Sequence, residues 1–309
     1  MDFMIGGLAA GGATLFSNPF DVVKTRMQLQ GELKPRGQHQ VIYKNTMKGG
    51  YVIAKTEGVR GLQRGLATAL MTQIVRDSTR LGLYQWFHKN GYLTDDNGKT
   101  ILYKSAVVSA ATGAAGAFLS SPLFLIKTQL QSQAAQKISV GTQHGHKGLH
   151  AAFRTIYKDE GIFGLWRGGV ATCMRAVVGS STQLTTFAIS KDLLREYELF
   201  LRYPVVASFV ASIICSFVQC VLMNPFDLVS TRLYNQGVDK SGKGVLYDGL
   251  VDAYIKIFKN EGFRGFYKGV TASYVRLARH GTFCLVFWDV LKDLQEKYID
   301  KPKDPTRNS

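Results

Sequence analysis

Arginines lie inside apolar stretches of this 309-residue sequence, where charged side chains are unusual. Arg76 and Arg80 fall in one stretch, Arg175 in a second and Arg276 in a third. An arginine in an apolar setting is costly unless it faces water or a partner, and its planar guanidinium can bind carboxylate, sulfate or phosphate through two hydrogen bonds. These residues therefore predict a wet cavity that binds small anions.

The arginines belong to one stripe of side chains. The three stretches align at offsets of 103 and 101 residues, and the aligned positions are spaced i, i+4 and i+8, which places them on one helix face. The levels of the stripe are Thr72 with Arg175 and Arg276, Arg76 with Gly179 and His280, and Arg80 with Gln183 and Cys284. We expect the substrate to be bound by Arg80, Arg175, Arg276, Arg76, Thr72, Gln183, His280 and the neighbouring Arg279.

Asp77 is the acid nearest to this stripe. We expect it to pair with Arg80, three residues along the same helix, and a role in proton coupling is the alternative. The basic side chains still outnumber the acidic ones, which leaves positive charge for an anionic ligand to neutralise. The alternative for the arginines is that backbone carbonyls hold them and no ligand binds.

Two sequence motifs recur along the chain. Pro19, Pro122 and Pro225 begin the segments PFDVVKTRMQ, PLFLIKTQLQ and PFDLVSTRLY at intervals of 103 residues. The second motif runs from Glu57 to Gly65, from Glu160 to Gly168 and from Glu261 to Gly269, at offsets of 103 and 101 residues. Two motifs that keep nearly the same period indicate three copies of one unit.

The order proline-acid-base, followed by acid-glycine and aromatic-base-glycine, resembles the signature of the mitochondrial carrier family along residues 1 to 297. The resemblance implies an all-α membrane protein with six transmembrane helices, pseudo-threefold symmetry and short surface helices on the matrix side. It also implies a location in the mitochondrial inner membrane. We place the three repeats at 1–90, 100–194 and 203–297, with a polar tail at 298–309.

The sequence predicts where these helices lie. Spans are expected near Asp2–Gln30, 65–89, Tyr103–Gln131, Gly169–Tyr197, Tyr203–Tyr234 and Val270–Lys297, each longer than the ~20 residues that cross a bilayer. Surface helices are expected near Lys44–Thr56, Gly148–Asp159 and Tyr247–Asn260. Because the small residues Gly6–Gly11 already belong to the first span, we expect no cleavable leader.

The orientation follows from the loops between these helices. The three long loops hold 18 of the 24 Lys and Arg residues in the connections. The positive-inside rule therefore places these loops in the matrix and both termini in the intermembrane space.

In the family that the sequence resembles, the acid and base after each proline pair between repeats and close the matrix end of the cavity. By this rule Asp21 pairs with Lys127 and Asp227 with Lys24, and the third pair would be Phe124 with Ser230. Because both partners of that third pair are replaced, no charge is left uncompensated. We expect two matrix salt bridges, with Gln28 and Gln131 behind them and Tyr234 in the place of a third glutamine.

At the cytoplasmic end the family has an aromatic-acid pair followed by a base. The corresponding residues here are Gln85 with His88, Ala188 with Lys191, and Asp289 with Lys292. Only Asp289 and His88 could form an ionic pair between repeats, and a neutral histidine would weaken it. We therefore expect a resting state that is closed toward the matrix and open toward the cytosol. The alternative is that these are surface charges of little energetic effect.

The residues around Arg175 bear on the choice of anion. The run Arg175-Ala176-Val177-Val178 resembles the dicarboxylate and oxoglutarate carriers, although Thr72 departs from the arginine of oxoglutarate carriers at that level. The sequence as a whole is most similar to the oxaloacetate and sulfate carrier branch. The resemblance implies antiport of small dianions such as oxaloacetate, malate, malonate, sulfate or thiosulfate. Transport of phosphorylated or nucleotide anions and a substrate-independent proton leak are the alternatives.

The charge of the whole chain fits the same interpretation. A net charge of +16 is compatible with nucleic acid, anionic lipid or anionic substrates as partners. Because the basic residues are spread over all three repeats, we expect metabolite anions and cardiolipin as partners and no nucleic acid. The repeats close a cavity within one chain, so we expect a monomer.

Enzyme motifs are absent from the sequence: there is no P-loop, dinucleotide fingerprint, GxSxG or HExxH. The four cysteines have no metal-binding spacing, and we expect them to be buried free thiols. His144, His146 and His150 could form a metal site in a polar loop, but a solvated loop is the preferred interpretation. We therefore expect a protein that is not an enzyme, with no metal and no cofactor apart from bound cardiolipin.

Overall fold

Long helices dominate the computed structural model, which describes residues 2–35, 40–93, 101–194, 196–197, 200, 204–239 and 242–277. Three of them carry the repeated prolines: α1 (Asp2–Leu29), α4 (Leu102–Ser132) and α8 (Pro204–Asn235). The helices α3 (Leu66–Lys89) and α6 (Gly169–Leu194) follow the second motif in the first two repeats. Residues 270–277 begin the equivalent helix of the third repeat.

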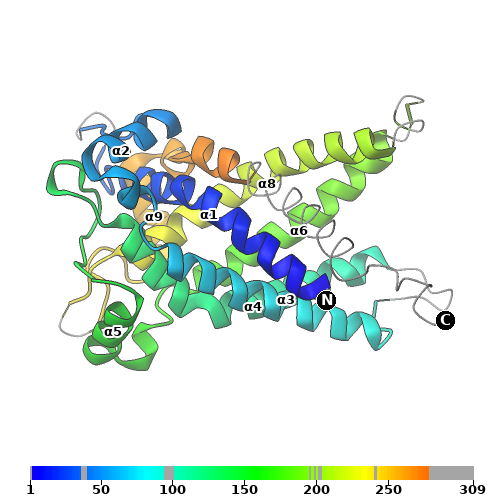
Figure 1. Cartoon of the computed structure of the whole chain (residues 1–309), viewed down its shortest axis with the longest axis horizontal. Coiled ribbons are helices and arrows are strands. Elements are labelled where there is room, and N and C mark those ends of the chain that lie inside the picture. The colour runs from blue at the N-terminus through cyan, green and yellow to red at the C-terminus, as the bar shows by residue number, and fades with distance from the viewer. Residues whose placement is uncertain are drawn as a thin grey trace, which may run out of the picture.

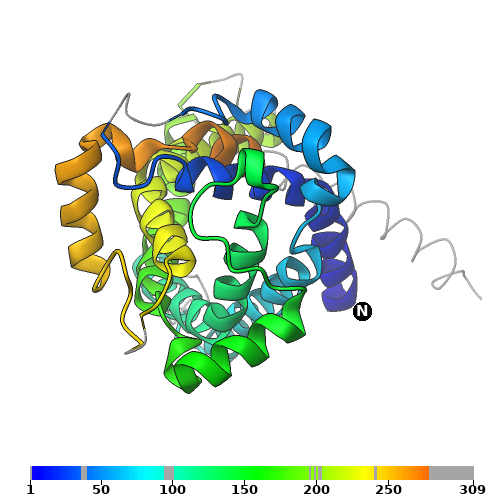
Figure 2. The same ribbon diagram turned by 90° about the vertical axis from the view of Figure 1, so that its left-hand side faces the viewer.

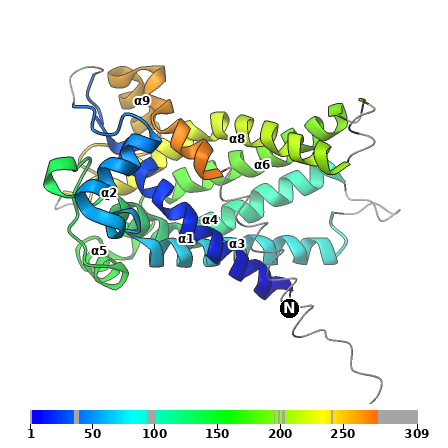
Figure 3. The ribbon, with the colours of Figure 1, turned by 45° about the horizontal axis from the view of Figure 1, so that its top comes forward.

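Three shorter helices gather at one end of the molecule, as Figures 1 and 3 show. They are α2 (Thr46–Leu62), α5 (Leu149–Gly164) and α9 (Leu250–Glu261). In the view along the long axis they lie at the periphery, around the ends of the long helices (Figure 2). Two 3-10 turns complete this end, Gln136–Ile138 and Phe263–Tyr267.

Each short helix packs on the proline helix of its own repeat. Equivalent side chains share a buried cluster in each repeat: Val22 with Ile53, Leu125 with Ile156, and Leu228 with Ile257, all at most 3% exposed. The apolar core is therefore divided into three clusters at one end, and the centre between the long helices is left to polar side chains.

In the first two repeats the proline frees a backbone carbonyl to which the second motif donates a hydrogen bond. A proline inside a helix has no N–H, so the carbonyl four residues earlier loses its helical partner. The freed carbonyl of Leu15 accepts a hydrogen bond from Gln63 Nε2 at 3.0 Å, and that of Phe118 accepts one from Trp166 Nε1 at 3.0 Å. The aromatic position of the second motif therefore supports the proline helix of the same repeat.

The acid-glycine step joins the short helix to the long ones. Gly58 has φ 71°, a left-handed conformation that favours glycine, and α2 is kinked there. Glu57 beside it binds Arg26 through two contacts of 2.9 and 3.0 Å. The equivalent pair in the third repeat is Glu261 with Arg232.

The second repeat lacks this arrangement because Gln129 replaces the arginine. Glu160 contacts Arg167 instead, at 2.9 Å. Gln129 accepts from His146 Nε2 at 3.0 Å and donates to the carbonyl of Tyr234 at 3.2 Å. The C-terminal ends of α4 and α8 are therefore joined by neutral groups.

The predicted helix positions agree with the structure apart from their ends. The short helices α2 and α5 run past the expected ends at Thr56 and Asp159, because the chain resumes helical turns after Gly58 and Gly161. The expected last span lies outside the described residues beyond position 277. By length and apolar composition alone, two helices in the described part qualify as membrane spans, Tyr103–Ser132 and Phe209–Asn235.

Candidate functional site

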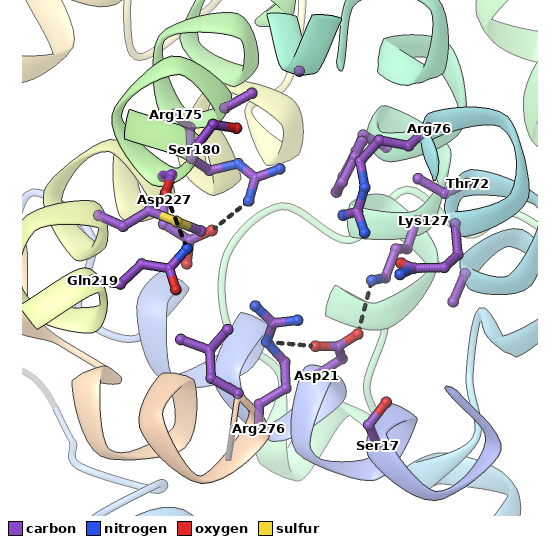
Figure 4. Close-up of a pocket in the computed structure, with 18 of the residues that line it drawn as sticks. Ser17, Asp21, Thr72, Arg76, Lys127, Arg175, Ser180, Gln219, Asp227 and Arg276 are labelled. Carbon is purple, nitrogen blue, oxygen red and sulfur yellow. Dashed lines mark hydrogen bonds and ion pairs between the residues drawn. The ribbon is translucent and has the colours of Figure 1, made fainter. Parts of the chain in front are cut away.

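A cavity of about 240 Å³ lies between the long helices, and Figure 4 shows side chains entering it from several of them. Its walls include Thr72, Arg76 and Arg80 from α3, Arg175, Gly179 and Gln183 from α6, and Arg276 from the segment 270–277. The stripe predicted from the sequence therefore faces one cavity, as far as the structure describes it.

The cavity has an excess of positive charge. Among the residues that the structure describes, six basic side chains line it, Lys24, Arg76, Arg80, Lys127, Arg175 and Arg276. The acidic residues in the lining are Asp21 and Asp227. The lining therefore leaves an excess of four positive charges, which an anion can neutralise.

Two ion pairs form the floor of the cavity. Lys127 Nζ lies 2.8 Å from Asp21 Oδ2, and Lys24 binds Asp227 Oδ2. Both carboxylates are less than a tenth exposed, so each depends on its protein partners for counter-charge. The structure thus contains both ion pairs that the sequence predicts.

The glutamines behind these pairs have different partners. Gln28 Nε2 donates to Asp227 Oδ2 at 3.1 Å, and its Oε1 accepts from Thr231 at 2.9 Å. Gln131 binds Asn18 and Thr25 rather than the ion pair itself. Gln28 therefore supports a gate carboxylate directly, whereas Gln131 fastens α4 to α1.

The third pair of positions, Phe124 and Ser230, carries no charge. Ser230 donates to the carbonyl of Phe226 in its own helix at 2.7 Å. Phe124 has its ring 5.1 Å from the guanidinium of Arg175 and 5.8 Å from Lys127 Nζ, both within the range of cation–π contacts. The residue that replaces the gate acid is therefore a platform for cations.

Tyr234, in the place of a third glutamine, lies fully inside the protein. Its hydroxyl contacts Ser121 of α4 at 3.0 Å and Thr172 of α6 at 2.5 Å. It therefore fastens α8 to the two neighbouring long helices.

The two arginines at the deepest level of the stripe contact the gate carboxylates. Arg175 Nη1 lies 3.8 Å from Asp227 Oδ1, and Arg276 Nε lies 3.2 Å from Asp21 Oδ1 (Figure 4). Each gate aspartate is thus shared between a lysine on one oxygen and an arginine on the other. Thr72, at the same level, donates its hydroxyl to the carbonyl of Thr68 at 2.6 Å and is 2% exposed.

Asp77 has other partners than the sequence indicates. Its carboxylate lies 3.0 Å from Arg76 Nε and accepts from Gln73 Nε2 at 2.7 Å. The predicted pairing with Arg80 is wrong, because the carboxylate pairs with the guanidinium of the adjacent Arg76. Arg80 lines the cavity, and no carboxylate among the described residues lies at salt-bridge distance from it.

Other predicted residues cannot be placed in the site. His280, Arg279, Asp289 and Lys292 lie outside the described residues, and so does the side chain of Lys191. Gln85 and His88 are described and exposed near the end of α3, away from the ion pairs. The predicted cytoplasmic pair of Asp289 with His88 stays a prediction.

The sequence stripe missed other polar side chains that line the cavity, on the proline helices and on α6. Gln219 of α8 lines the cavity and donates from Nε2 to the carbonyl of Gly179 at 3.2 Å. Ser17 of α1 and Ser180 of α6 line it as well. The signal for Gln219 was a single amide in an otherwise apolar stretch, which in a membrane helix indicates a face turned toward water or a partner.

The histidines of the polar loop are held by the protein. The rings of His144 and His146 stack at 5.7 Å, and His144 Nε2 contacts the carbonyl of Asn235 at 3.0 Å. Burial lowers the pKa of both rings. Among the described residues no group of three His, Cys, Asp or Glu side chains is arranged to hold a metal ion.

The sequence matches the family described as mitochondrial carrier protein along residues 1–93, 99–198 and 201–298. It is 45% identical to solute carrier family 25 member 35 of Homo sapiens over 294 residues, which cover 95% of this chain and 98% of that protein. It is 44% identical to the Mus musculus protein of the same name, with 96% and 99% covered. It is also 39% identical to the mitochondrial oxaloacetate transport protein of Schizosaccharomyces pombe over 298 residues, covering 96% of this chain and 91% of that protein.

Proposed function

The chain belongs to the mitochondrial carrier family, and we propose that it exchanges small dianions across the mitochondrial inner membrane. Members of this family are transporters rather than enzymes. The proposed substrates are dicarboxylates such as oxaloacetate, malate and malonate, or sulfur oxoanions such as sulfate and thiosulfate. The relative from Schizosaccharomyces pombe is named as an oxaloacetate transport protein, which supports the dicarboxylate class.

One observation carries this proposal: the cavity lining holds four more positive than negative side chains. A dianion neutralises half of that excess, and Arg175, Arg276 and Arg80 offer planar guanidinium groups to its oxygens. Arg175 is less than a tenth exposed, so an anion there is shielded from bulk water and held more strongly.

The transport step follows from the ion pairs at the cavity floor. We propose that Asp21 with Lys127 and Asp227 with Lys24 close the matrix side while the cavity is open toward the cytosol. Exchange then requires that these pairs break and that a weaker set near His88 and Asp289 forms at the other side. A ligand shifts such an equilibrium only by binding the two states unequally.

We also propose how the chain is arranged in the membrane, from its membership of the carrier family. Three repeats at 1–90, 100–194 and 203–297 each cross the membrane twice, so that six helices span it and both termini face the intermembrane space. The cavity is formed by one chain, which supports a monomer.

Bound cardiolipin is proposed at two surface pockets between repeats. One is lined by Arg64 and Lys147 at the beginnings of α3 and α5, and the other by Arg167 and Lys243 at the beginnings of α6 and α9. Helix N-termini and basic side chains together favour phosphate groups.

Uptake into liposomes tests the transport proposal. Purified protein is reconstituted, the vesicles are left empty or preloaded with sulfate or oxaloacetate, and labelled sulfate and oxaloacetate are added outside. We expect uptake only into preloaded vesicles, with loss in Arg175→Ala and retention in Arg154→Gln, a variant of an exposed arginine on α5. Absence of uptake by folded wild-type protein would exclude both anions and favour phosphorylated anions or proton leak, which are then assayed in the same vesicles.

A further inference from the structure

The ion pairs at the cavity floor differ between the three boundaries of the repeats. Lys127 with Asp21 joins the first and second repeats, and Lys24 with Asp227 joins the first and third. The corresponding position between the second and third repeats holds Phe124 and Ser230, which carry no charge. A floor built only from the residues after the prolines would therefore have one boundary without an ionic link.

Arg175 crosses that boundary. It belongs to α6 of the second repeat, and its Nη1 lies 3.8 Å from Oδ1 of Asp227 in α8 of the third. This is the one ion pair between the second and third repeats in the described part of the chain. The other oxygen of Asp227 is held by the first repeat, through Lys24 and Gln28.

Phe124 positions Arg175 for this contact. The guanidinium carbon lies 5.1 Å from the centre of the Phe124 ring, which provides an apolar and polarisable surface in place of a gate acid. An acid at position 124 would instead compete with Asp227 for Arg175. The replacement that removes the third gate pair thus also frees Arg175 to reach Asp227.

We propose that Arg175 is the latch between the second and third repeats, and that an anion opens the matrix gate by drawing Arg175 away from Asp227. The inference rests on the proposed binding of an anion in this cavity. At 3.8 Å the latch is longer than a hydrogen bond, whereas Lys127 lies 2.8 Å from Asp21, so the Arg175 contact yields first. Asp227 then keeps Lys24 alone as its ionic partner.

The proposal gives Arg175 a role that differs from that of Arg80. Arg80 lines the same cavity, but its position on α3 gives it no contact with a gate aspartate in the described structure. Loss of Arg80 would weaken anion binding alone, whereas loss of Arg175 would weaken anion binding and also loosen the closed gate in the absence of any anion.

A double-mutant cycle on the full chain in detergent tests the latch without an anion. Melting temperatures are measured for wild type, Arg175→Gln, Asp227→Asn and the double variant, with Arg80→Gln replacing Arg175→Gln in a parallel cycle. We expect the Arg175 and Asp227 effects to be non-additive by about 2 to 4 °C, as for contacting charged residues, and the Arg80 cycle to be additive. Additive effects of Arg175 and Asp227 would overturn the proposal.

If these variants fold poorly, a second test adds an ionic pair between the second and third repeats, at the positions of Phe124 and Ser230. The double variant Phe124→Glu with Ser230→Lys places an ionic pair directly between the second and third repeats, and the new lysine gives the new carboxylate a partner other than Arg175. Because this link does not include Arg175, an anion that binds Arg175 leaves it in place. We expect a higher melting temperature and roughly tenfold slower exchange than wild type, with Phe124→Leu as the control for the lost ring. Exchange as fast as wild type, in protein with the raised melting temperature, would overturn the latch.

The two proposals fail in different ways. If wild-type protein takes up no small dianion, the transport proposal fails while the anion-free cycle still reports on the contact of Arg175 with Asp227. If uptake occurs and the cycle is additive, the substrate assignment stands and the latch is wrong.

Discussion

Lys127 and Asp21 join α4 to α1 across the cavity floor, 2.8 Å apart, and Arg276 reaches the other oxygen of the same carboxylate at 3.2 Å. Charges from all three repeats therefore meet at Asp21, as they also do at Asp227. Its environment determines what a charge reversal at this pair does.

We predict that Lys127→Asp abolishes exchange, because two carboxylates would then face each other in a confined site. Adding Asp21→Lys restores the opposite charges. Recovery should be partial, since the new lysine lies beside Arg276 in place of the carboxylate that Arg276 now contacts. Exchange rates in liposomes measure both variants, and equal activity of the single and the double variant would show that this pair does not form the gate.

The acid of the second motif should contribute more to stability in the first repeat than in the second. Glu57 is 3% exposed in its side chain and binds Arg26, whereas Glu160 has Arg167 as its one ionic partner in the described part of the chain. We predict that Glu57→Gln lowers stability by about 3 kcal/mol and Glu160→Gln by about 1 kcal/mol. Thermal unfolding of the two variants gives the comparison, and equal losses would contradict the role assigned to Arg26.

Acid should loosen the junction of α4 and α8 through its histidines. Burial lowers the pKa of His144 and His146 below the ordinary value of 6.5. The unfolded chain therefore binds protons more tightly than the folded protein, so the stability from the neutral rings is present above pH 6.5 and falls as the pH drops below it. We predict that melting temperature falls less with acid in His144→Gln/His146→Gln than in wild type.

The contribution of the two histidines to the pH dependence of the melting temperature is obtained by comparing variants, because Glu32 also titrates in this range. Burial raises the pKa of Glu32 to about 6, so this carboxyl contributes stability at low pH that is lost as the pH rises through 6. It acts in the opposite sense over the same range. His150→Gln, which changes an exposed histidine in the same segment, is the matched control. Identical acid sensitivity in all variants would refute the histidine prediction.

The hydroxyl of Tyr234 should act on stability and leave anion binding unchanged. It joins α8 to Ser121 and Thr172, below the arginines of the cavity. We predict that Tyr234→Phe lowers stability by about 1 to 2 kcal/mol, because both neighbouring hydroxyls lose a buried partner. The concentration of anion that gives half-maximal exchange should stay as in wild type, and a large change in it would place Tyr234 in the binding site.

Periodicity and the family resemblance together predicted the parts of the site that repeat. The offsets of 103 and 101 residues placed Arg175 and Arg276 on one level. Both ion pairs were predicted from the pairing of acid and base between repeats that the family resemblance implies, applied to the residues after the prolines. The same rule indicated that the pair of Phe124 with Ser230 carries no charge.

What breaks the symmetry could not be predicted. The contact of Arg175 with Asp227 joins α6 to α8, and its length depends on how far the two helices are rotated and separated. The partner of Asp77 is Arg76 rather than Arg80, because the choice is made by rotamers and not by spacing. The Gln129 and His146 contact arises from a loop whose path no periodic pattern specifies.

We predict that anion exchange depends on the charge of the cavity arginines, and charge-neutral variants test this dependence. Initial rates of oxaloacetate exchange are measured in liposomes for wild type, Arg175→Gln, Arg276→Gln and Arg154→Gln, with equal amounts of folded protein. We expect a loss of roughly a hundredfold in the first two variants and no loss in Arg154→Gln. Rates in Arg175→Gln and Arg276→Gln that match wild type would contradict anion binding by these residues.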